Sequence, residues 1–411
     1  MDDARSRQVV IAGAGIAGLT AAIAFAERGH PVQIFEQAPR LEAAGAGIQL
    51  SPNATRILRQ LGVLDRLLPH AVRPEAVVLK DAATLRELAR VPLGQAGESR
   101  WGAPYLVAHR ADVQAALTAQ AAGCRDIELV TGARVTDLAN APQGVAVTVE
   151  ADGRRIEASG QLLVGADGVW SSLREKLAVM EPGFGKSRFS GELAWRATVA
   201  AESAAGEAFA TVGGTDCVTT FLHPGFHLVA YPVSQGSAFN LAAFTRGERI
   251  AEGWSGHADP AILSGAMRGT APALARLVAQ ASPWTAFPIH TVAQQRWTTP
   301  AGIALIGDAA HAMTPFAAQG AAMAIEDAAM LAGMVADFPD DPGQSLAVWE
   351  NLRRPRIAKV LRRGALNRLA WHAWGPVAIA RNLVLATRPA EKLAADLDWL
   401  YGWEARKVVR R

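Results

Sequence analysis

The sequence predicts an α/β fold that contains an inserted antiparallel β-sheet and ends in a helical region. Short apolar runs that end in glycine alternate with helical patterns at residues 9–36, 161–178 and 303–336, and this alternation is typical of parallel strands. Between about residues 185 and 290 the pattern changes to alternating apolar and polar residues, which indicates antiparallel strands; Phe226–Val233 is an example. After about residue 345 the pattern is helical to near the end of the chain.

Length and composition limit the class of protein. With 411 residues, of which 50% are hydrophobic and 19% charged, the chain is typical of a globular enzyme of two or three domains. A net charge of +3 is too small to indicate nucleic-acid binding, and the basic tip at 406–411 is expected to be a solvated tail. The two cysteines have no CxxC partner, so a reducing cytoplasm fits best. The polar start is unlike a signal peptide, and no apolar run is long enough to predict a membrane span.

The first element is a βαβ unit. Val9-Val10-Ile11-Ala12 predicts a buried strand, and Gly13-Ala14-Gly15-Ile16-Ala17-Gly18 follows it directly. A helix is expected from about Ala17 to Arg28, and a second strand, Val32–Phe35, leads to Glu36. Strand, glycine turn, helix, strand and acid in this order predict a Rossmann-like dinucleotide site.

Each part of this unit has a physical task. Gly13 allows the tight turn, Gly15 lets a pyrophosphate approach the backbone, and Gly18 lets the helix pack closely on the strand. The helix N-terminus offers unpaired N–H groups to the phosphates. Glu36 can accept hydrogen bonds from the adenosine ribose, which favours FAD or NAD over NADP.

Two later strands end in an acid. Gln161–Gly168 ends in Asp167-Gly168, and the run that starts at Ile303 ends in Gly307-Asp308. An aspartate at the carboxyl end of a parallel strand lies at the crevice where α/β folds bind ligands, so Asp308 can bind a sugar-alcohol chain such as the ribityl group. A helix expected from Gly320 could direct its positive end at a flavin ring.

The three motifs together resemble the single-component FAD-dependent aromatic hydroxylases, the family of para-hydroxybenzoate hydroxylase. Further features resemble its salicylate hydroxylase and 6-hydroxynicotinate or 3-hydroxybenzoate monooxygenase branch, and the resemblance covers nearly the whole chain. These features are Gly45-Ala-Gly-Ile48 with Asn53, His109-Arg110, Ala194-Trp195-Arg196, Gln319-Gly320-Ala321 and Trp399-Leu-Tyr-Gly402.

The resemblance implies an enzyme that binds FAD tightly but non-covalently and consumes NADH or NADPH without a second dinucleotide fold. Oxygen would pass through a flavin C4a-hydroperoxide to a small aromatic substrate, phenolic or a hydroxypyridine and often carboxylated. The predicted FAD-binding residues are Gly13, Gly15, Ala17, Gly18, Glu36, Gly47, Arg110, Asp167, Asp308, Gly320 and Ala321. Asp167 could instead only cap the helix that follows it.

Three residues are predicted to act on the substrate. Strand alternation puts His227, Val229 and Tyr231 on one face, and the resemblance places a histidine and a tyrosine at this spacing in the substrate site. His227 is the first candidate for a base that helps to form a phenolate, with His223 as its rival.

The resemblance places the backbone of Pro315 over the flavin. Arg196 and Arg246 are the candidate anchors for a substrate acid, and no metal site is predicted because no third ligand accompanies the two histidines.

The predicted domains follow from these patterns. Residues 1–75, 101–180 and 285–345 form a discontinuous FAD-binding domain, 76–100 and 181–284 a β-rich substrate domain, and 346–411 a helical C-terminal region. A monomer or a homodimer is expected. Two alternatives remain open: an FAD-dependent oxidase or dehydrogenase that needs no nicotinamide, and a non-catalytic FAD-binding protein.

Overall fold

The computed structural model describes residues 7–41, 46–141, 144–248, 259–293, 296–339 and 341–405. Gly45 of the predicted Gly45–Ile48 motif and the basic tip at 406–411 lie outside the described residues.

A six-stranded sheet carries the three glycine-ending runs. Its strand order is β17-β18-β11-β1-β2-β7, and all neighbours are parallel except β17 and β18. Because β18, β11 and β1 are adjacent, their carboxyl ends bring the glycine turn and both acid motifs to one edge. The strands are β1 (Val9–Ala12), β2 (Val32–Glu36), β7 (Ile127–Thr131), β11 (Leu162–Gly165), β17 (Thr298–Thr299) and β18 (Ile303–Leu305).

A seven-stranded sheet forms the second large layer, in the order β16-β12-β15-β14-β13-β4-β5. The antiparallel strand predicted at Phe226–Val233 is confirmed as β14, which pairs with β15. The strands are β4 (Ala76–Asp81), β5 (Glu87–Pro92), β12 (Ser187–Ala200), β13 (Cys217–Leu222), β14 (Phe226–Val233), β15 (Ala238–Arg246) and β16 (Thr285–Val292).

The expected domain boundary between residues 284 and 285 needs a correction. It assigns β16 to the FAD-binding domain, whereas β16 pairs with β12 and so belongs to the seven-stranded sheet. The pairing partner is about 100 residues earlier in the chain, which no local pattern reveals. Two smaller sheets complete the strands: β8 (Ala133–Ala141), β9 (Gly144–Ala151) and β10 (Arg154–Gly160), and β3 (Gly47–Leu50) with β6 (Leu106–His109).

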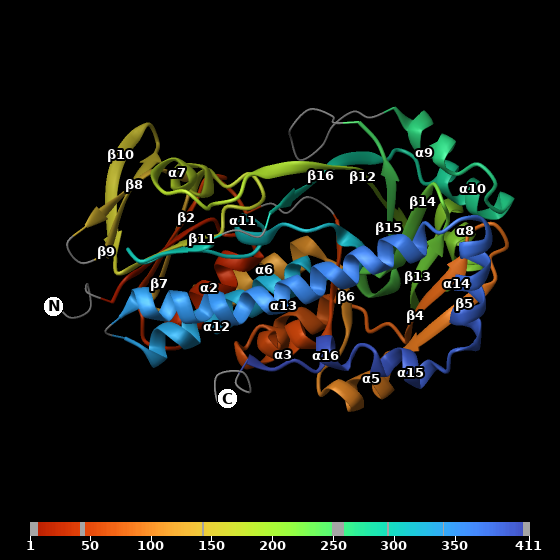
Figure 1. The fold of residues 1–411 in the computed structure, drawn as a ribbon, viewed down its shortest axis with the longest axis horizontal. Helices are drawn as coiled ribbons and strands as arrows, with labels where there is room; N and C mark the ends of the chain where they lie inside the picture. The colour runs from red at the N-terminus through yellow and green to blue at the C-terminus, as the bar shows by residue number, and fades with distance from the viewer. Residues whose placement is uncertain are drawn as a thin grey trace.

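Three helices place the site between the two large sheets. Helix α2 (Ile16–Ala26) is apolar almost throughout, and nine of its residues are buried, as expected for a helix enclosed on all sides. Helix α12 (Gly320–Asp337) packs against α2. Gly307 lies where the two helices meet, since a Cβ built on it would contact Ala17 of α2 and Ala324 of α12. Helix α13 (Pro342–Trp371) runs past both large sheets, and the chain then returns through α15 and α16 below them (Figure 1).

The remaining helices lie around these layers. They are α3 (Pro52–Gln60), α4 (Leu64–Leu67), α5 (Gly94–Trp101), α6 (Arg110–Ala122), α7 (Ser172–Met180), α8 (Ala204–Val212), α9 (Pro260–Ala266), α10 (Pro272–Gln280), α11 (Asp308–His311), α14 (Gly375–Thr387), α15 (Ala390–Ala395) and α16 (Asp398–Tyr401). None of the described helices is long and apolar enough to cross a membrane.

Candidate active site

Two adjoining cavities lie at the carboxyl edge of the six-stranded sheet. One, of about 600 Å³, surrounds the start of α2 and the end of β2. The other, of about 430 Å³, extends to the seven-stranded sheet. The two cavities are adjacent and together form one site between the two sheets. The residues that line both are Gly15, Ile16, Arg110, Ala166, Gly168, Arg196 and Asp308.

The 600 Å³ cavity is shaped for a dinucleotide. The Glu36 carboxylate accepts hydrogen bonds from the backbone N–H of Ala14 at 2.8 Å and of Ala38 at 2.9 Å, which fixes it at the end of β2. Gly15 lines both cavities, and a Cβ built on it meets no protein atom within 4 Å. The missing side chain therefore leaves space for a ligand beside the α2 N-terminus, and the residues present fit FAD.

Glycines of the turn serve two different purposes. Gly13 has φ of +101°, a left-handed conformation that side chains rarely adopt, and it faces the 600 Å³ cavity. A Cβ on Gly18 would collide with the carbonyl of Gly13, so Gly18 allows the turn and α2 to pack. Gly18 is the one predicted FAD residue that lines neither cavity; the ten others all do.

The two acids at the strand ends differ in environment. Asp308 begins α11, is exposed, and lines both cavities, so its carboxylate is available to a ligand. Asp167 lines the 600 Å³ cavity and accepts a hydrogen bond from Leu173 N–H at 3.1 Å, so it also caps α7. The other carboxylate oxygen, Oδ1, is buried without a described protein partner, and burial raises the pKa of the Asp167 carboxyl group.

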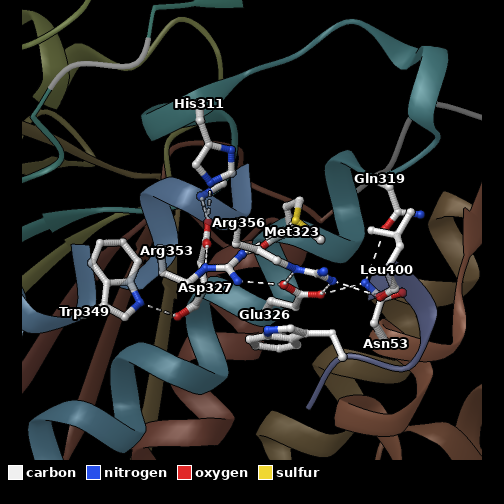
Figure 2. A network of polar contacts seen from close by, with 12 residues as sticks. Asn53, His311, Gln319, Met323, Glu326, Asp327, Trp349, Arg353, Arg356 and Leu400 are labelled. Carbon is white, nitrogen blue, oxygen red and sulfur yellow. Dashed lines mark hydrogen bonds and ion pairs between the residues drawn. The ribbon is translucent and has the colours of Figure 1, made fainter. Parts of the chain in front are cut away.

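A buried polar network holds the loop before Asp308 (Figure 2). One carboxylate oxygen of Asp327 accepts hydrogen bonds from Gly307 N–H at 3.0 Å and from His311 Nε2 at 2.6 Å. The other oxygen accepts from Arg353 Nε at 2.7 Å. Burial alone would raise the pKa of Asp327, but His311 and Arg353 outweigh it and lower the value to about 2. The carboxylate is thus a fixed anion that orients the Gly307-Asp308 turn.

The same network reaches the C-terminal segment through Glu326. Its carboxylate accepts from Arg353 at 2.7 Å, from Arg356 at 2.8 Å and from Asn53 Nδ2 at 2.7 Å, so α3, α12 and α13 are joined at one point (Figure 2). Arg356 also donates to two carbonyls of the C-terminal segment, those of Trp399 and Leu400. The network therefore connects the first turns of α12 with the C-terminal segment at Trp399 and Leu400.

The 430 Å³ cavity extends from the FAD-site loops to the seven-stranded sheet. Pro315 and the first residues of α12, Gly320 and Ala321, line one side, so the positive end of this 18-residue helix faces the cavity. Gly47 N–H donates to the Asn240 side-chain carbonyl at 2.7 Å, which ties β3 to β15 in the cavity wall. The wall at the seven-stranded sheet includes Tyr231.

Comparison with known proteins identifies the family. A family model described as an FAD binding domain matches residues 6–364. The chain is 35% identical to 3-amino-4-hydroxybenzoate 2-monooxygenase of Streptomyces platensis, over 98% of each chain. It is 30% identical to 3-hydroxybenzoate 6-hydroxylase of Polaromonas naphthalenivorans, over 100% of this chain and 99% of that one.

The chain belongs to the FAD-dependent aromatic hydroxylases. It is 31% identical to 6-hydroxynicotinate 3-monooxygenase of Bordetella bronchiseptica, over 86% of this chain and 90% of that one. Its fold matches a salicylate hydroxylase substrate complex with a TM-score of 0.78 at 22% identity, covering 98% and 97% of the two chains. The hydroxylase is thus an FAD-dependent monooxygenase, with NAD(P)H as the co-substrate typical of this family.

In this hydroxylase His227 lies outside the cavity wall, although Val229 and Tyr231 of the same strand face line it. The His227 ring stacks on Phe244 with centroids 4.6 Å apart and lies 4.9 Å from the Phe316 ring. Its Nδ1 is 3.1 Å from Nε2 of His372. Burial lowers the pKa of His227 well below 6.5, and the nearby His372 lowers it further, so the ring is neutral. Its role as a base stays a prediction.

The rival candidates lie elsewhere. His223 is partly exposed in the turn before β14, where its Nδ1 accepts from Gly225 N–H at 3.2 Å, and it does not line the cavity. Of the two candidate acid anchors, Arg196 lines both cavities, whereas Arg246 is exposed and lines neither.

Sequence reasoning missed several residues of the hydroxylase cavity. All three tyrosines of the chain line it, and of these only Tyr231 was predicted, whereas Tyr105 and Tyr401 were not. Tyr105 donates to Gln49 Oε1 at 2.7 Å, and its ring centroid lies 5.9 Å from that of Tyr401. The signal for Tyr401 was the Trp399–Gly402 motif, which the sequence assigned to the family without a role.

Proposed function

We propose that this hydroxylase acts on a small aromatic ring that carries both a hydroxyl and a carboxylate, with NAD(P)H and O2 as co-substrates. Three relatives support the substrate class, because their names place hydroxyl and carboxylate groups on a benzene or pyridine ring. The observation that carries the proposal is the 430 Å³ cavity, which continues from the FAD site and has three phenols in its wall.

FAD, when bound, supplies the redox chemistry that activates oxygen. In our proposal Glu36 and the turn at Gly15 bind its adenosine half, and Asp308 binds the sugar-alcohol chain. The N-terminus of α12 at Gly320 and Ala321 stabilises negative charge on the ring. The shared cavity walls and the open space beside Gly15 support these assignments.

We assign the substrate hydroxyl to the Tyr231 end of the cavity. Burial raises the pKa of Tyr231 well above 10, so its phenol stays protonated and can donate a hydrogen bond. A donor held beside a phenolic oxygen favours the phenolate, which is the form that attacks electrophilic oxygen more readily. Pro315, which also lines the cavity, keeps its predicted place over the flavin as part of this proposal.

A substrate panel tests the function. The purified holoenzyme is mixed with NADH or NADPH and a series of hydroxybenzoates, aminohydroxybenzoates and hydroxynicotinates, while NAD(P)H oxidation, O2 uptake and product mass are followed. We expect one group of acids to speed flavin reduction and to gain one oxygen atom. The proposal fails if no aromatic compound does either. Flavin that stays oxidised when mixed anaerobically with both nicotinamides would favour an oxidase or dehydrogenase instead.

We further propose a cytoplasmic setting, which the two free cysteines, Cys124 and Cys217, support. Whether the enzyme is a monomer or a homodimer is decided by light scattering of the holoenzyme.

A further inference from the structure

One face of α13 forms a wall of the substrate cavity. Arg363, Asn367 and Trp371 all line it, and their spacing of four residues places them on the same side of the helix. Asn367 donates to the Phe316 carbonyl at 2.9 Å, which fixes this face beside the Pro315 turn. The long C-terminal helix, expected from the sequence only as a helical region, thus contributes polar groups to the site.

The C-terminal segment before residue 406 also lines the cavity. Leu397, Leu400 and Tyr401 line it, and the segment from Leu397 to Trp403 is held from three directions. The anchors are Arg356, which donates to the Trp399 and Leu400 carbonyls, Arg56, which donates to the Trp403 carbonyl at 2.6 Å, and Arg100, which binds the Asp398 carboxylate at 2.6 Å. Tyr401 is therefore a fixed part of the wall.

Arg363 and Tyr401 are two hydrogen-bond donors in the wall of the same cavity. Burial raises the pKa of Tyr401 to about 12, although the charge of Arg363 opposes this rise, so the phenol is protonated. Among the residues that the structure describes, no carboxylate forms an ion pair with Arg363. A half-buried guanidinium and a phenol that line one cavity suit an anion that arrives with the ligand.

The other arginines of the cavity also line the 600 Å³ cavity. Arg110 and Arg196 line both cavities, beside Gly15 and Asp308, where the phosphates and ribityl chain of FAD are expected. Arg363 lines only the 430 Å³ cavity. The negative groups of FAD therefore lie on the side of Arg110 and Arg196, and Arg363 is left for the substrate.

We infer that Arg363 and Tyr401 form the subsite that binds the carboxylate of the aromatic substrate. This inference rests on the proposed function and adds the orientation of the ring. The carboxylate lies against α13 and the C-terminal segment, and the hydroxyl lies toward Tyr231. Neither Arg196 nor Arg246, the anchors expected from the sequence, has this role.

The test compares acids with the same rings lacking the carboxylate: 3-hydroxybenzoate with phenol, and 3-amino-4-hydroxybenzoate with 2-aminophenol. Binding to the oxidised holoenzyme, without NAD(P)H, is measured from the change in the visible spectrum of FAD. We expect Arg363→Met to weaken binding of the better acid by about 10- to 100-fold, and Tyr401→Phe by about tenfold. Binding of the matched phenol should change less than twofold, and Arg363→Lys should recover part of the loss.

Arg362→Met is the matched control, because Arg362 is the neighbouring exposed arginine on α13 and does not line the cavity. It should bind acids and phenols as the wild type does. FAD content and the circular dichroism spectrum of each variant show that it is folded.

Equal losses for acid and phenol in Arg363→Met, or no loss for the acid, overturn the subsite. A wild type that binds or hydroxylates the phenols as well as the acids overturns it too, while the proposed hydroxylation stands. If no aromatic acid or phenol in the panel binds or is hydroxylated, the proposed function and the subsite fall together.

Discussion

Arg353 Nε lies 2.7 Å from Oδ1 of Asp327, and both side chains are completely buried. The pair is not isolated, because Arg353 also binds Glu326 at 2.7 Å and Asp327 also holds the Gly307 amide. Removing the cation would leave two buried carboxylates with fewer partners, which is far more costly than losing a surface ion pair. The Arg353–Asp327 ion pair therefore links the stability of the fold to the geometry of the Gly307-Asp308 turn.

Arg353→Met is expected to destabilise the protein by about 3–5 kcal/mol, which corresponds to a fall in the thermal midpoint of about 3–6 °C for a chain of this size. FAD should be released at a lower temperature as well, because the Gly307 turn loses its support. Thermal unfolding followed by circular dichroism and by flavin fluorescence measures both. Arg73→Met removes an exposed pair with Glu98 and should cost at most about 1 kcal/mol. Equal midpoints for the two variants would contradict this account of the network.

Gly15→Val is expected to abolish tight FAD binding without unfolding the protein. A side chain at Gly15 meets no protein atom within 4 Å of its Cβ, so it would occupy the ligand space instead. The ratio of flavin to protein absorbance after purification measures the loss, and circular dichroism checks the fold. Gly265→Ala in α9, where a Cβ also meets open space, should retain its flavin. A Gly15→Val protein that purifies with full FAD content would show that the cofactor lies elsewhere.

Tyr231→Phe is expected to slow product formation by about 10- to 100-fold and to affect it more than His227→Asn does. The reason is position, since Tyr231 lines the cavity whereas His227 lies outside its wall, stacked on Phe244. Stopped-flow measurement of flavin reduction and of product formation separates the two half-reactions, and reduction by NAD(P)H should change little. A larger loss in His227→Asn would restore this histidine as the base.

His372 makes the native state sensitive to acid. Burial, together with the charges of Arg368 and Arg246, lowers its pKa to about 4, whereas an unfolded histidine titrates near 6.5. As pH falls from 6.5 toward 4 the unfolded chain binds a proton that the native chain does not, so stability is lost across this range.

We therefore expect His372→Gln to lose less stability than the wild type between pH 7.5 and pH 5. Because His372 is partly exposed, the difference should be about 1 kcal/mol rather than the larger value for full burial. Urea unfolding at the two pH values measures it. Identical pH dependence in the two proteins would mean that His372 protonates freely in the native state.

The FAD half of the site could be predicted because its signals are local. The turn from Gly13 to Gly18, the acid Glu36 and the strand ends at Asp167 and Asp308 each need only neighbouring residues to be recognised. Parallel strands then bring them to one edge, as the order β18-β11-β1-β2 shows.

The substrate half could be predicted only in part. Alternation along β14 placed Val229 and Tyr231 on the cavity side, but it gave no sign that Phe244 and Phe316 lie against His227. Arg363 gave no local signal either, because one arginine among many on a helix is normally a solvated residue.

The sequence by itself determined the cofactor, the layered α/β fold and the family, since these depend on short motifs whose geometry the backbone dictates. Only the tertiary structure decided which side chains face the substrate cavity. Its wall combines β14, α13 and the last helical turn near Tyr401, about 170 residues from Tyr231 in sequence. Contacts between such distant segments depend on how whole elements pack, and no local pattern of residue types records that packing.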